Sequence, residues 1–79
     1  MISFEIKVQE KSTPDEVEAY FDSSGLNDLI AQLEMIRSGK TDHAHLMAKS
    51  WGGSHLDDEA HIASNMPVRH VKMTLVQPS

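Results

Sequence analysis

The sequence predicts a small α+β domain. We expect a four-stranded, largely antiparallel sheet in the order β-β-α-β-β, with one helix packed on one face. Three observations support this: two alternating apolar/polar segments near the amino end, an apolar stripe of helical spacing after them, and a return to alternation near the carboxyl end. A chain of 79 residues is long enough for one domain, residues 1–79, with one small core.

The amino-terminal third predicts a hairpin. Residues 2–8 and 17–22 each alternate apolar and polar side chains, which is the period of a strand with one buried face. Between them, residues 10–15 are polar and contain a proline, as turns do. The core-facing residues of the second strand are expected to be Val17, Ala19 and Phe21. Its solvent-facing residues are expected to be Glu16, Glu18, Tyr20 and Asp22.

A helix is predicted over residues 24–38. Ser23 and Ser24 can cap the free N–H groups of its first turn, and Gly39 suits its carboxyl end. An apolar stripe should pack the helix on the sheet, with its leucines fully buried. The stripe consists of Leu26, Leu29, Ile30, Leu33 and Ile36.

Two more strands are expected, over residues 43–48 and 68–76. The connection between them, residues 49–67, is unusually long for a compact domain, and such connections are often functional. Trp51 is expected to be buried and to anchor this connection; exposure at an interface is the alternative. Because one helix covers one sheet face, the other face is left without cover, which is the main structural clue to function.

Composition narrows the class of partner. The net charge of −5 argues against nucleic acid, whose phosphates would repel the chain, and is compatible with a basic protein. The alternative is that mild acidity only keeps the domain in solution. The chain has no cysteine, no apolar run that could cross a bilayer, and no signal-peptide pattern at its amino end. A cytoplasmic protein without a membrane partner is therefore expected.

Two acidic segments are the candidate partner-binding residues. One is the outward side of the second strand, with carboxylates around an aromatic ring, although it could be an ordinary solvated face. The other lies in the long connection, where Trp51 could also contribute. The candidate residues are Glu16, Glu18, Tyr20, Asp22, Trp51, Asp57, Asp58 and Glu59.

No motif predicts catalysis or a cofactor. The serines lack a Gly-x-Ser-x-Gly turn, and the glycine pair at residues 52–53 is not followed by the lysine of a phosphate-binding loop. We therefore expect a protein that is not an enzyme. His43, His45 and His70 could approach one another if their strands pair, and three imidazoles can bind zinc. Because no complete ligand set accompanies them, we expect no metal.

Several segments in order resemble a known family. They are Val17-Glu18-Ala19-Tyr20-Phe21-Asp22, Ser24-Gly25-Leu26, His43-Ala44-His45-Leu46-Met47, Ser50-Trp51-Gly52-Gly53 with Leu56, and His70-Val71-Lys72 with Leu75. Over nearly its whole length the chain resembles the immunity protein 32 family of bacterial polymorphic toxin systems.

The resemblance implies a cytoplasmic bacterial protein that binds a cognate toxin domain and neutralises it by stoichiometric occlusion. It supplies no catalytic residue and does not identify the toxin. A nuclease with a basic cleft would suit the acidic residues of this chain. The alternative from the residues is a small homodimer that associates through the uncovered sheet face, and a histidine metal-binding protein is a further one.

Overall fold

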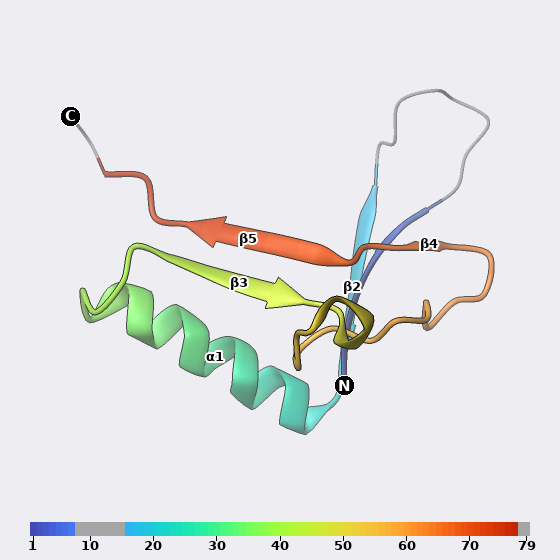
Figure 1. The fold of residues 1–79 in the computed structure, drawn as a ribbon, viewed down its shortest axis with the longest axis horizontal. Helices are drawn as coiled ribbons and strands as arrows, with labels where there is room; N and C mark the ends of the chain where they lie inside the picture. Colours follow the sequence, from blue (N-terminus) through green and yellow to red (C-terminus); the bar gives the residue numbers. More distant parts are fainter. Residues whose placement is uncertain (8–15, 78–79) are drawn as a thin grey trace.

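The computed structural model describes residues 1–7 and 16–77. Over these residues it is an α+β fold with one α-helix and antiparallel strands, as the sequence predicted (Figure 1). The elements are β1 (Ile2–Ile6), β2 (Val17–Phe21), α1 (Ser23–Arg37), β3 (His43–Met47), the short 3-10 helix η1 (Lys49–Trp51), β4 (Met66–Pro67) and β5 (His70–Thr74). The expected turn at residues 10–15 lies outside the described residues.

The strands form two sheets, so the expected single four-stranded sheet is wrong. One sheet has the order β2-β1-β4, and the other pairs β3 with β5. Residues 68–76 were expected to form one strand. Only His70–Thr74 of this segment forms β5, and the two residues before it cross from the β1 sheet to the β3 sheet. Val68 N–H donates to Phe4 O of β1 (2.8 Å), and Ala48 N–H donates to Arg69 O next to β3 (2.8 Å). Two consecutive residues thus bond to different sheets.

Helix α1 begins one residue earlier than expected and is capped by Asp22, so the expected serine cap is wrong. The Asp22 carboxylate accepts a hydrogen bond from Gly25 N–H (2.8 Å), which satisfies a free donor of the first turn. Gly25 lies directly against Met1, since a Cβ there would sit 2.0 Å from Met1 O. Gly39 follows the helix with φ +86°, as expected for a glycine stop.

Only part of the helix stripe is covered. Ile36 is buried and Leu29 is partly buried against the core, but Leu33 is 52% exposed. The expected full burial of these leucines is therefore wrong. Figure 1 shows α1 lying along β3, with the β1–β2 hairpin standing across the end of this layer. A two-stranded sheet is too narrow to cover the whole stripe.

The core is small and lies where β1, β3 and the long connection meet. Its fully buried members come from β1, from β3 and the residue that follows it, and from the connection. Ala48, directly after β3, forms an isolated bridge with Leu56 of the connection. Side chains of α1, β1 and β5 pack around it. The buried cluster is Ile2, Leu46, Ala48 and Leu56, with Phe4, Leu29, Val71 and Met73 packed against it.

The β1–β2 hairpin has its polar face covered and much of its apolar face open. Its register pairs Ser3 with Tyr20 and Glu5 with Glu18, so these four residues share a face. Ser3 and Glu5 are buried there, beneath residues 57–65 of the connection. On the other face, β2 is exposed, so the expected burial of its apolar residues is wrong. These residues are Val17, Ala19 and Phe21.

Candidate functional site

A buried carboxylate holds residues 57–65 on the hairpin. The side chain of Glu5 has no exposed surface and accepts four hydrogen bonds. The donors are Ser3 Oγ–H (2.5 Å) and His61 N–H (2.5 Å) to Oε2, and Ile62 N–H (3.2 Å) and Asn65 Nδ2–H (2.9 Å) to Oε1. Two backbone amides of the connection therefore depend on one side chain of β1.

These hydrogen bonds keep Glu5 ionised. Burial alone would raise the pKa of this carboxyl, but the donors from Ser3, Asn65, His61 and Ile62 outweigh burial and lower the pKa to about 2. Charge-assisted hydrogen bonds of this kind are stronger than neutral ones. The connection is thus fastened by a charged group that has no water contact.

The same contacts use two of the residues expected to face solvent. Asn65 also donates to Glu18 Oε1 (2.8 Å), and the Tyr20 ring stacks on His61 with centroids 4.7 Å apart. Both Glu18 and Tyr20 are half-buried, so their expected outward orientation is wrong. Burial and the neighbouring Glu18 carboxylate raise the pKa of Tyr20. The two residues help to hold the connection in place.

The remaining acids of the strand set are also engaged. Asp22 caps α1 and accepts from the Met1 amino group (2.6 Å), while Glu16 lies 4.0 Å from Lys7 Nζ. The Met1 amino group and Gly25 N–H lower the pKa of Asp22. Glu16 and Asp22 are exposed, but each has a local partner. The second strand therefore does not present one continuous acidic patch.

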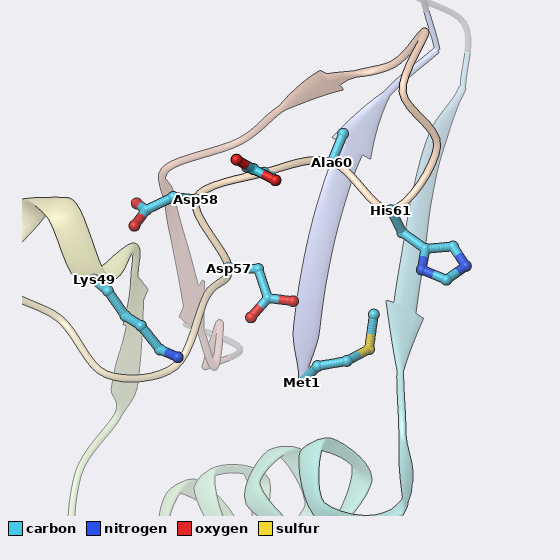
Figure 2. Close-up of a pocket in the computed structure, with 7 residues that line it drawn as sticks. Met1, Lys49, Asp57, Asp58, Ala60 and His61 are labelled. Carbon is cyan, nitrogen blue, oxygen red and sulfur yellow. The ribbon is translucent and has the colours of Figure 1, made fainter.

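The acids of the connection gather around a shallow hollow of about 490 Å³ (Figure 2). Asp58 accepts a hydrogen bond from Ser50 N–H (3.1 Å). The pKa of Asp58 is lowered by hydrogen bonds from Ser50 and by the charges of Arg69 and Lys49. Glu59 is exposed. The hollow is lined by Met1, Lys49, Asp57, Asp58, Glu59, Ala60 and His61.

Trp51 lies beside this acidic segment and is 56% exposed. Its expected burial is wrong. It ends η1 and is followed by Gly52, whose φ of +85° favours glycine, and by Gly53. A Cβ on Gly53 would lie 2.3 Å from Met47 O, so this turn packs closely on β3 through backbone rather than through the indole. Because Asp58 binds the amide of Ser50, the exposed tryptophan and the acidic segment are held together.

We call this region the acidic surface; it consists of Trp51 and Asp57–Glu59. It unites sequence candidates that lie six residues apart in the chain. Glu5 and Asn65 hold the connection that carries this surface, and the sequence did not indicate that role. A glutamate in an alternating strand is normally expected to face solvent. Lys49 and His61 at its hollow were also not predicted, and no sequence signal would have found them.

The three strand histidines do approach one another on the outer face of β3–β5. His45 Nδ1 lies 2.8 Å from His70 Nε2, and the His43 and His45 rings meet edge to face at 5.1 Å. His43 Nδ1 lies 2.7 Å from the Asp42 carboxylate. Burial and the neighbouring His43, His70 and Lys72 lower the pKa of His45. Within residues 1–7 and 16–77, no three His, Asp or Glu side chains are placed to hold a metal ion.

Comparisons with known proteins found no relative whose binding surface could be compared with the acidic surface. In the part of the chain that the structure describes, no helix is long and apolar enough to cross a membrane. The chain matches no family model, no curated protein and no solved structure.

Proposed function

We propose that this chain is a protein-binding domain of the immunity type, which neutralises a cognate toxin by covering the toxin's basic active surface. The binding region is the acidic surface. The observation that carries the proposal is the exposed Trp51, whose neighbour Ser50 donates its N–H to Asp58 in a run of three acids. The proposal of a toxin as partner rests on the resemblance to the immunity protein 32 family. The choice of the acidic surface rests on the exposure and contacts of its residues.

The acidic surface combines the two kinds of group that such binding needs. Carboxylates at an exposed surface raise the encounter rate with a basic partner, and this steering weakens as salt rises. A large aromatic side chain at the same place can become buried in the complex and slow dissociation. Occlusion requires binding alone, so the proposal assigns no catalytic residue and no cofactor.

The test is co-expression with the carboxyl-terminal domain encoded by a neighbouring toxin gene, followed by binding kinetics at low and high salt. We expect protection of the cells and an association rate that falls as salt rises. Reversing Asp57 and Glu59 to lysine should lower the association rate about tenfold at low salt, whereas Trp51→Ala should mainly raise the dissociation rate. Asp58 is left unchanged because it holds Ser50.

Asp28→Lys on α1 is the matched control for Glu59→Lys made alone. Asp28 is an exposed acid outside the acidic surface, and its reversal changes the net charge by the same amount. It should leave association nearly unchanged. Absence of both protection and complex would overturn the immunity proposal. A complex that forms at one rate at every salt concentration, or that responds equally to Asp28→Lys, would overturn the assignment of the acidic surface.

A further inference from the structure

The side of the hairpin opposite the acidic surface carries apolar residues without cover. Val17 is 63% exposed and Phe21 is 45% exposed, on the face of β2 that an alternating strand normally buries. Ala19 lies between them and is also exposed. The apolar face of β2 is thus solvent-exposed at each of its three positions.

Helix α1 continues this exposed region. Leu26, Ile30 and Leu33 are all exposed and recur at i, i+4 and i+7, so they form one flank of the helix. β2 ends at Phe21 and α1 begins two residues later, so the two exposed apolar segments are neighbours along the chain. We call this combined region the apolar surface; its members are Val17, Ala19, Phe21, Leu26, Ile30 and Leu33.

The outer edge of β2 is also free among the strands that the structure describes. Because the sheet order is β2-β1-β4, β2 pairs with β1 on one side only. Exposed edges in monomeric proteins are usually blocked by proline, lysine or a bulge. Residues 17–21 contain neither proline nor lysine, and their register with β1 runs without interruption. This edge is therefore open to another strand.

The charges beside the apolar surface do not oppose a second copy. Lys7 and Glu16 lie at the open end of β2 and pair with each other at 4.0 Å, and Arg37 pairs with Glu34 at the end of α1. Among the described residues, each end of the surface is therefore locally neutral. Within residues 1–7 and 16–77, a basic partner would find no acidic excess at these two ends, and an identical surface would meet no uncompensated charge there. A small chain without disulfides also gains stability by association.

The sequence of β2 is suited to pairing with itself. In an antiparallel pair centred on Ala19, a twofold axis passes midway between the two copies of that residue and places Val17 opposite Phe21 of the second copy. A β-branched residue opposite an aromatic one is a favourable cross-strand pair. The same register places Glu18 opposite Tyr20 and avoids facing two glutamates.

We propose that two copies of this chain form a twofold dimer in which their β2 strands pair antiparallel about Ala19 into one continuous sheet, with the exposed apolar residues of the two strands side by side on the same face. Asp57 N–H donates to Ile2 O of β1, and β1 lies on the side of β2 away from the proposed pairing, so the dimer leaves Asp57–Glu59 free. The dimer stands independently of the immunity proposal.

The test is sedimentation equilibrium of the full chain over a range of concentrations, with two charge variants. The wild type should be dimeric. Val17→Glu places a charge opposite Phe21 of the second copy at both ends of the paired strands and should raise the dimer dissociation constant about tenfold or more. Met35→Glu is the matched control, since Met35 is an exposed apolar residue outside β2. It should leave the dimer intact.

A second variant tests the register without relying on the first. The chain has no cysteine, so Ala19→Cys introduces a single thiol at the proposed axis. Opposed residues of paired strands come close enough for a disulfide, so mild oxidation should give a covalent dimer. Thr74→Cys, exposed on β5, should not cross-link. A monomeric wild type, a dimer that Met35→Glu and Val17→Glu affect equally, or cross-linking through residue 74 but not 19 would each overturn the proposal.

Discussion

The two faces of the β1–β2 hairpin are covered in different ways. On the polar face, Ser3 and Glu5 are buried beneath the connection. On the apolar face, Ile2 of β1 is in the core, while the apolar side chains of β2 are exposed. The difference shows that hydrogen bonds can cover a polar face as fully as packing covers an apolar one: residues 61 and 62 present backbone N–H groups that need an acceptor, and the buried Glu5 carboxylate supplies it. The β2 part of the apolar face is left available for a partner.

Two leucines also differ in burial, and replacing the buried one should give the largest expected change in the free energy of unfolding. Leu46 of β3 is fully buried in the core, whereas Leu33 of α1 is 52% exposed. Leu46→Ala should lower the free energy of unfolding by about 2–5 kcal/mol, because it removes packing from the core. Leu33→Ala should cost under about 1 kcal/mol when measured at concentrations at which the chain is monomeric. Equal losses in urea unfolding would contradict the core described above.

The contact between the connection and the polar face of the hairpin should be weakened by replacing Glu5. Glu5→Gln replaces one accepting oxygen by an NH₂ group, which would face donors of the connection and leave at least one buried amide unpaired. We expect the free energy of unfolding to fall by about 3 kcal/mol, the scale of hydrogen bonds to a charged group. Glu59→Gln, at an exposed acid of the same connection, should change it by no more than about 0.5 kcal/mol. Similar melting of both variants would show that Glu5 does not hold the connection.

Acid should weaken the same contact. The pKa of Glu5 is lowered from 4.5 to about 2 in the folded chain, so the unfolded chain binds a proton more readily. The stability from ionised Glu5 is therefore complete above about pH 4.5 and is lost as the pH falls towards 2. Thermal melting between these pH values should decline more steeply in wild type than in Glu5→Gln. Parallel declines would indicate that other acids dominate.

A smaller effect concerns Trp51. Because it is 56% exposed, its fluorescence in the native state should already lie near that of tryptophan in water, with little red shift on unfolding. The spectrum should be measured in the monomeric Val17→Glu variant as well, to separate exposure within one chain from association. Strongly blue-shifted emission from that monomer would mean that Trp51 is packed in the domain and unavailable to a partner.

Local patterns in the sequence predicted the elements well but not their assembly. The α+β class, the helix with its glycine stop, and the hairpin all follow from periodicity and turn chemistry. The division into two sheets does not, because it depends on Val68 and Arg69 bonding to different strands. A strand's alternation specifies two faces and does not specify which face the rest of the chain covers.

The candidate site shows the same limit. The acids at residues 57–59 and Trp51 were both suggested by composition, but their proximity depends on Asp58 binding Ser50 across eight positions of chain. Glu18 and Tyr20 looked accessible because nothing in β2 itself reveals that Asn65 and His61 lie on them. Long-range contacts of single polar side chains leave no periodic signal.

Amide hydrogen exchange at His61 and Ile62, followed by NMR, tests the covered polar face most directly. Both N–H groups donate to the buried Glu5 carboxylate, although residues 57–65 form no helix or strand. The account predicts slow exchange of both amides in wild type and fast exchange in Glu5→Gln, while Ser64, exposed in the same connection, exchanges fast in each. Fast exchange of residues 61 and 62 in wild type would contradict the covered polar face.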